Sequence, residues 1–146
     1  MKRNVIIIIF SILVVALISS CSSKPQNITE PTIYEQMQAN KIEYVGDSSG
    51  VDRLLKLLPN FDQNYIQRFF SLQTISEPYG VTICYEPSEQ YSGESMKVTA
   101  EMTTYAGYLF ECIDNLGYIE FAYRLSSSNG NYEESAYELL WRVDRE

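Results

Sequence analysis

The sequence contains no histidine and few basic residues, and both shortages exclude classes of function. Without histidine, the chain lacks the side chain that most often serves as a general base and as a metal ligand. Its 11 basic residues are outnumbered by 19 acidic ones, which gives a formal net charge of −8. Phosphate backbones repel a chain this acidic, so we expect no nucleic acid among its partners.

Motifs that mark catalytic and cofactor sites are missing as well. The sequence has no Gly-x-Ser-x-Gly or Ser-x-x-Lys motif, no phosphate loop and no Asp-x-Asp-x-Asp-Gly calcium loop. The adjacent acids Glu133 and Glu134 are more typical of a solvated helix start than of a calcium site. We therefore predict no enzyme activity, no cofactor and no bound metal. The alternative is a small hydrolase that uses carboxylates alone, as glycosidases do.

Residues 1–20 have the pattern of a lipoprotein signal peptide. Lys2 and Arg3 precede a run of 14 residues, 5–18, that is apolar except for one serine. This run is shorter than the roughly 20 residues that a membrane-spanning helix needs. Residues 18–21 then read Ile-Ser-Ser-Cys, which resembles a lipobox. We expect cleavage between Ser20 and Cys21 and a lipid on Cys21 that anchors the chain to a membrane. An uncleaved anchor helix with an incidental cysteine is the alternative.

A polar linker follows the expected lipidation site. Residues 22–31 contain two prolines and mostly polar side chains, which is typical of a flexible tether. A short helix within residues 32–40 is suggested by Ile33 and Met37, which are four positions apart. We divide the chain into a signal peptide at 1–20, the lipidated cysteine and its tether at 21–40, and a globular domain at 41–146.

The domain alternates between helical and extended patterns. Apolar residues recur at helical spacing in 49–58, 95–116 and 132–142, and alternate in 66–76, 81–85 and 118–125. Pro78 and Gly80 suit a tight turn between the first two strands, with Gly80 in its left-handed position. We predict an α+β, two-layer sandwich in the order α-β-β-α-β-α. Its small three-stranded sheet is mostly antiparallel, with helices on one face and water on the other. An all-β barrel is the alternative if the threonines after Ser95 form a strand.

The strand patterns predict which side chains face the helices. Ile83 and Phe121 are expected inward, and Glu86 and Glu120 outward. In the first strand Ile66, Phe70 and Leu72 are expected to share a face, with Arg68 as an exception. Cys84 is expected on the face opposite Ile83, whereas Cys112 is expected in the core. Two free, buried cysteines are therefore favoured over a disulfide.

Tyrosine is the one residue type in clear excess, with 12 copies. Its ring gives contact area and its hydroxyl gives a polar tip, so exposed tyrosines suit peptide or glycan binding. Four of the 12 fall on predicted inward faces and are interpreted as packing residues: Tyr85, Tyr105, Tyr123 and Tyr132. Tyr79 and Tyr118 are the two expected to be exposed, and they are the candidate binding aromatics.

Four separate segments carry a resemblance to a known family. They are residues 44–49 (Tyr-Val-Gly-Asp-Ser-Ser), 72–74 (Leu-Gln-Thr), 77–83 (Glu-Pro-Tyr-Gly-Val-Thr-Ile), and the pair 109–110 (Leu-Phe) with 113–115 (Ile-Asp-Asn). Together they resemble domain of unknown function 4825, an extracytoplasmic domain, over about residues 41–125. The resemblance implies a short bacterial lipoprotein, or an outer module attached to a membrane-embedded metallopeptidase-type sensor. It implies no activity and no site residues.

These observations together predict a role outside the cytoplasm. We expect a lipoprotein on the outer side of a bacterial cell membrane that acts as a non-catalytic binding, accessory or sensory module of the cell envelope. Its partner would be an envelope protein, a peptide or a cell-wall fragment. An inhibitory or structural lipoprotein is the further alternative.

Overall fold

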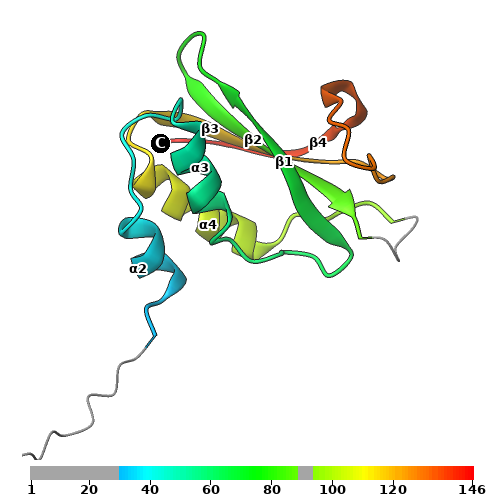
Figure 1. Ribbon diagram of the computed structural model, residues 1–146, viewed down its shortest axis with the longest axis horizontal. Helices are drawn as coiled ribbons and strands as arrows, with labels where there is room; N and C mark the ends of the chain where they lie inside the picture. Colours follow the sequence, from blue (N-terminus) through cyan, green and yellow to red (C-terminus); the bar gives the residue numbers. More distant parts are fainter. Residues whose placement is uncertain (1–29, 89–93) are drawn as a thin grey trace, which may run out of the picture. The chain divides into compact units, whose positions relative to one another are not determined.

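Three helices and four strands are arranged as an α+β domain in the computed structural model, which describes residues 30–88 and 94–146 (Figure 1). In chain order they are α2 (Ile33–Gln38), α3 (Ser48–Leu55), β1 (Tyr65–Gln73), β2 (Tyr79–Pro87), α4 (Ala100–Cys112), β3 (Leu116–Tyr123) and β4 (Glu138–Asp144), with a 3-10 turn at Glu134–Ala136 before β4.

The four strands form one mixed sheet in the order β1-β2-β3-β4. The β1–β2 hairpin is antiparallel, α4 connects β2 to its parallel neighbour β3, and β4 returns antiparallel to β3. A parallel pair needs a long crossover, which α4 supplies. The prediction of a three-stranded, mostly antiparallel sheet is therefore wrong. The all-β alternative is also wrong, because α4 is helical and is capped by Thr99.

The predicted last helix at 132–142 is the source of this error. Its residues form the 3-10 turn and then β4, in which Trp141 pairs with Phe121 and Val143 pairs with Ile119. Leu139 and Leu140 are adjacent apolar residues at a bulge, and their spacing from Val143 imitates a helical face. The strand forms because β3 would otherwise leave a row of backbone groups unpaired at the sheet edge.

One face of the sheet packs against the helices and forms the core. Figure 1 shows α3 and α4 on the same side of the sheet. Ile83 and Phe121 are completely buried at the centre of this face, as the strand patterns predict. The helices contribute the buried side chains of Met37, Val51, Leu54, Leu55, Met102, Ala106, Leu109 and Cys112.

Helix α2 belongs to this core, although it precedes the expected domain start at residue 41. Thr32 and Glu35 form a reciprocal capping box that begins the helix. Met37 is completely buried, and the compact unit of the chain begins at Pro31. The residues before position 41 therefore include a helix, α2, that packs on α4.

A bulge in β1 divides its apolar residues between the two faces. Gln67 pairs with Tyr85 but Phe69 pairs with Cys84, so Arg68 is the extra residue. Phe70 and Leu72 therefore face the core, whereas Ile66 pairs with Glu86 on the opposite face. The prediction that Ile66 shares a face with Phe70 is wrong, and the physical reason is the one-residue shift that a bulge introduces.

The opposite face of the sheet, called the outer face here, carries Thr82, Cys84 and Glu86 and is partly covered by residues 124–137. Glu86 is only 1% exposed. It accepts a hydrogen bond from the Ser128 backbone N–H at 3.0 Å and another from the Tyr137 hydroxyl. Tyr132 packs on Phe69 with ring centroids 5.4 Å apart. The expectation that water covers this whole face is therefore wrong.

Candidate functional site

The segments that carry the family resemblance lie far apart in the sequence but meet at the turn end of the β1–β2 hairpin. They surround a hollow of about 390 Å³, which we call the hairpin-end hollow. The segment before α3 contributes three lining residues, the β1–β2 turn two, and the start of β2 and the loop before β3 one each. These residues are Tyr44, Val45, Gly46, Thr74, Glu77, Tyr79 and Asn115.

Backbone hydrogen bonds hold the floor of this hollow in place. The Asn115 side-chain oxygen accepts a hydrogen bond from the Val45 N–H at 2.7 Å, and the Asn115 N–H donates to the Glu43 carbonyl at 3.3 Å. Just beside them, Ile42 forms a bridge with Ile113. Asn115 thereby ties the segment before α3 to the end of α4, so the lining residues have fixed positions.

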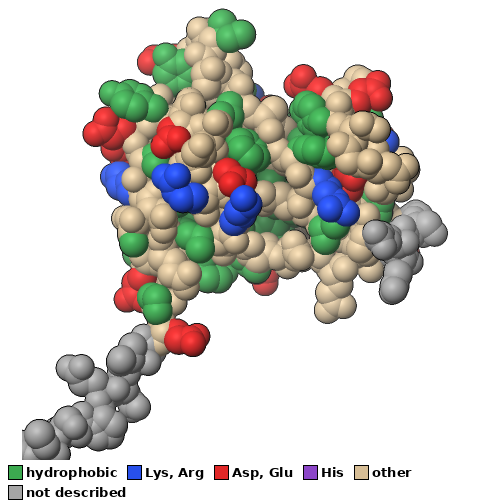
Figure 2. Space-filling view, in the orientation of Figure 1, with side chains coloured by type: hydrophobic (Ala, Val, Ile, Leu, Met, Phe, Trp, Pro, Cys, Tyr) green, Lys and Arg blue, Asp and Glu red, His purple; other side chains and the backbone are tan. Residues whose placement is uncertain are grey.

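The rim of the hollow is apolar and acidic. Tyr44 is 62% exposed, Tyr79 is half-buried, and Ile75 in the adjacent turn is 96% exposed. Glu77 is the one charged side chain among the lining residues, and it is exposed. On the side of the molecule that Figure 2 shows, the hairpin end carries apolar and acidic side chains, whereas basic side chains lie across the middle.

Gly46 has no side chain to fill the hollow, and its backbone conformation does not require glycine. A Cβ atom added at Gly46 would meet only the Thr74 Cγ2, at 3.9 Å, which is an ordinary contact distance. A larger side chain at Gly46 would therefore extend into space that is now empty. This position offers a way to fill the hollow without straining the fold.

Of the two predicted binding aromatics, only Tyr79 lies in this hollow. Tyr118 is 8% exposed and is therefore not an accessible contact residue. Its ring lies between Gly80 and Arg142, whose guanidinium is 3.7 Å from the ring centroid.

A Cβ at Gly80 would approach the Tyr118 ring to 2.1 Å, so glycine is needed there for close packing and not for a left-handed turn. The expected turn position of Gly80 is wrong, because Gly80 is already inside β2.

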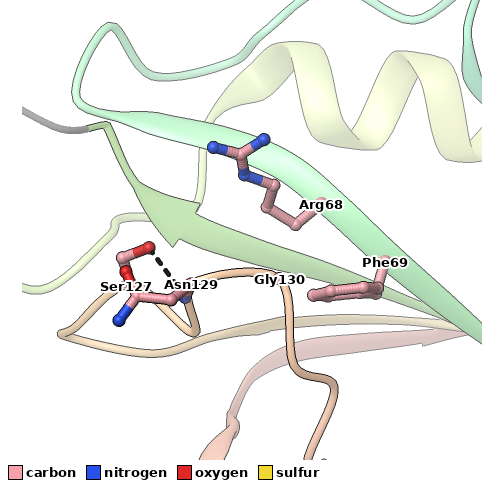
Figure 3. A pocket seen from close by; sticks show the side chains of 5 residues that line it. All are labelled: Arg68, Phe69, Ser127, Asn129 and Gly130. Atoms are coloured by element: carbon pink, nitrogen blue, oxygen red, sulfur yellow. Dashed lines mark hydrogen bonds between the residues drawn. The ribbon is translucent and has the colours of Figure 1, made fainter.

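A second cavity, larger than the hairpin-end hollow, lies on the outer face between β1 and the loop before β4 (Figure 3). It measures about 700 Å³ and is lined by Arg68, Phe69, Ser127, Asn129 and Gly130. Figure 3 shows Arg68 and Phe69 on the β1 side and the other three on the loop side, where the Asn129 N–H donates to the Ser127 hydroxyl at 3.3 Å. None of the segments that carry the family resemblance lines it.

A smaller outer-face pocket of about 200 Å³ brings Glu120 and Glu134 together with Cys84. Two carboxylates at one cavity are what a carboxylate-dependent hydrolase requires. However, Glu120 accepts a hydrogen bond from the Thr82 hydroxyl at 2.9 Å and is paired with Arg142 at 3.3 Å. These two contacts engage both oxygens of Glu120 in structural interactions.

The cysteines of the domain are free and buried, as the sequence favoured. Burial raises the pKa of the Cys84 thiol to about 12, with a further increase from nearby Glu134. Cys84 is therefore protonated at neutral pH and is not an activated nucleophile. Within residues 30–88 and 94–146, no group of histidine, cysteine and acidic side chains is arranged to hold a metal ion.

The structure leaves the expected lipidation site untested. Ser20 and Cys21 lie outside the described residues. In the part of the chain that the structure describes, no helix has the length and apolar character needed to cross a membrane.

The fold and the hollow define a small α+β domain with an open, partly aromatic cavity at one end of its sheet. The model of the family "Domain of unknown function (DUF4825)" matches residues 37–136. The chain therefore belongs to this family. No curated protein and no solved structure matched the chain.

Proposed function

We propose that the protein is a lipoprotein tethered to the outer side of a bacterial cell membrane, where its domain serves as a non-catalytic binding, accessory or sensory module of the envelope. The lipobox at residues 18–21 supports the anchor. Nine residues, 22–30, separate Cys21 from the compact unit. Fully extended, they reach about 30 Å, which keeps the domain close to the membrane surface.

One observation carries the binding role: four separate family-like segments converge on the hairpin-end hollow. The hollow combines the exposed Tyr44 and the half-buried Tyr79 with an exposed apolar neighbour, Ile75. Exposed aromatic rings and concave shape are common features of binding sites. The partner we propose is an envelope protein, a peptide or a cell-wall fragment. A catalytic role has less support, because the buried Cys84 thiol is protonated and both oxygens of Glu120 are engaged.

The anchor is tested by the substitution Cys21→Ala in the full chain expressed in a bacterium. We expect wild-type protein to incorporate an alkyne-labelled fatty acid and to be shortened at Ser20, because the thiol is the group that is alkylated. The variant should remain unlabelled and unprocessed. The control is Cys84→Ser, which removes a buried thiol of the domain and should keep the label. Normal labelling of Cys21→Ala would show that Cys21 is not the anchor.

The binding role is tested by placing a photo-crosslinking amino acid at Ile75, which is 96% exposed. We expect a discrete crosslinked product on irradiation of intact cells, because Ile75 adjoins the hollow. The additional substitution Gly46→Leu should remove this product by filling the hollow. A crosslinker at Glu101, which is exposed on α4, serves as the control position. Equal products with and without Gly46→Leu would contradict binding at the hollow.

A further inference from the structure

Among the described residues, the side chains that line the hairpin-end hollow include one carboxylate and no basic group. Glu77 lines the hollow and Glu43 adjoins its floor, and both are exposed. Neither forms an ion pair with another described residue. Two basic side chains contact the residues that precede Asn115, and both are engaged: Lys41 is paired with Asp114 at 2.7 Å, and the Arg145 guanidinium donates to the carbonyls of Phe110, Ile113 and Asp114. An incoming cation would therefore meet carboxylates that are not already neutralised.

The aromatic rings of the hollow favour the same kind of ligand. The face of a tyrosine ring is negatively polarised and attracts ammonium and guanidinium groups. Tyr44 and Tyr79 both line the hollow, and Tyr44 is 62% exposed. A carboxylate and tyrosine rings at one cavity together suit a basic side chain, whose alkyl stem also packs on apolar surface.

The exposed turn beside the hollow adds an apolar contact. Ile75 is 96% exposed and lies between two residues of the hollow, Thr74 and Glu77, in the sequence. A free basic amino acid would reach the hollow but would leave Ile75 uncovered. A peptide segment with basic and apolar residues next to each other would cover both features.

We propose that the hairpin-end hollow binds a basic segment of a partner protein, with a lysine or arginine side chain against Glu77 and the tyrosine rings and an apolar neighbour on Ile75. This inference rests on the proposed binding role and specifies the chemistry of the partner. The net charge of −8 draws such a segment towards the domain. It also makes the association weaken as salt is added.

The experiment uses the lipidated protein, purified from membranes and held in neutral detergent micelles, and a short fluorescein-labelled peptide of alternating lysine and leucine. Fluorescence anisotropy gives its affinity, and a peptide with glutamine in place of each lysine is the matched probe. We expect the lysine peptide to bind more tightly than the glutamine peptide. Glu77→Gln should weaken its binding about threefold, and Glu77→Gln with Tyr44→Ala about tenfold, because an exposed ion pair and a cation–π contact are each worth small factors.

Two further variants distinguish binding at the hairpin-end hollow from attraction by the net charge of the domain. Gly46→Leu should abolish binding of the lysine peptide by occupying the hollow. Glu101→Gln removes one exposed carboxylate from α4, away from the hollow, and should leave the affinity unchanged. If Glu101→Gln weakens binding as much as Glu77→Gln does, the attraction is only that of the net charge and the proposal fails.

The outcomes also distinguish this inference from the proposed function. Equal affinity for the lysine and glutamine peptides would overturn the basic-segment proposal, while a crosslink at Ile75 that depends on Gly46 would still support the binding role. Binding of vesicles rich in phosphatidylethanolamine, but of neither peptide, would instead assign the hollow to an amine-bearing lipid headgroup and would also overturn the proposal. Loss of the crosslink and of peptide binding together would reject both.

Discussion

The substitution Phe121→Ala is expected to lower the free energy of unfolding by about 3–5 kcal/mol. Phe121 is completely buried at the centre of β3. Its ring stacks on Trp141 with centroids 5.6 Å apart, and the Phe61 ring meets it edge-on at 6.2 Å. Truncation removes both ring contacts and leaves a cavity between the sheet and the helices, which adds to the lost transfer energy.

Urea unfolding of the full chain, followed by circular dichroism, measures this change. Phe121→Leu keeps most of the volume and should cost less than about 1.5 kcal/mol. Ile75→Ala, at a residue that is 96% exposed, should change the unfolding free energy by less than about 0.5 kcal/mol. A cost below about 1 kcal/mol for Phe121→Ala would contradict the placement of Phe121 at the core.

Elements whose partners are close in the sequence could be predicted from it. The β1–β2 hairpin and the inward faces of Ile83 and Phe121 follow from alternation and from a short turn. Strand β4 could not be predicted in this way, because its strand character depends on pairing with β3. Taken alone, the spacing of Ala136, Leu139, Leu140 and Val143 fits a helix, and the sheet edge overrides this local pattern.

Two of the bulges in the sheet, those in β1 and β4, limited what alternation alone could predict. The bulge at Arg68 moves Ile66 to the outer face, and the sequence indicates it only as a charged residue that breaks the pattern of β1. At the bulge between Leu139 and Trp141, Leu140 is the extra residue of β4, so two adjacent leucines lie in one strand. In both cases, the insertion of one residue changes which face the following side chains occupy.

The candidate site was partly predictable. Tyr79 was expected to be an exposed binding residue; it lines the hollow but is half-buried. Tyr44, Gly46, Thr74 and Asn115 were not identified as site residues, since they come from segments that meet only in the folded chain. The family-like segments were the available signal, because they contain all of these residues. Tyr118 was wrongly expected to be exposed, because the side chain that covers its ring, Arg142, belongs to β4.

The substitution Glu86→Ala is expected to lower the free energy of unfolding by about 3 kcal/mol, because Glu86 fixes residues 124–137 on the outer face. Its carboxylate is buried and accepts hydrogen bonds from the Ser128 N–H and the Tyr137 hydroxyl. Alanine would leave both donors without this acceptor. Glu133→Ala is the matched control: Glu133 is exposed, its carboxylate accepts a hydrogen bond from the Ser135 hydroxyl at 3.2 Å, and its loss should cost less than about 0.5 kcal/mol.

The contribution of Glu86 should also depend on pH in a definite direction. Burial alone would raise the pKa of Glu86, but the hydrogen bonds from Ser128 and Tyr137 and the charge of Arg124 bring its pKa below the ordinary value. A carboxylate with a lowered folded-state pKa stabilises the fold at pH values above its unfolded pKa, and this stabilisation is lost as the pH falls through the folded-state pKa. Glu86→Gln, which imitates the protonated acid in shape and charge, should therefore be less stable than wild type at neutral pH and approach wild type in acid. Unfolding free energies of both proteins across this pH range test the expectation, and a difference that stays constant into acid would show that the charge of Glu86 does not hold the outer-face segment.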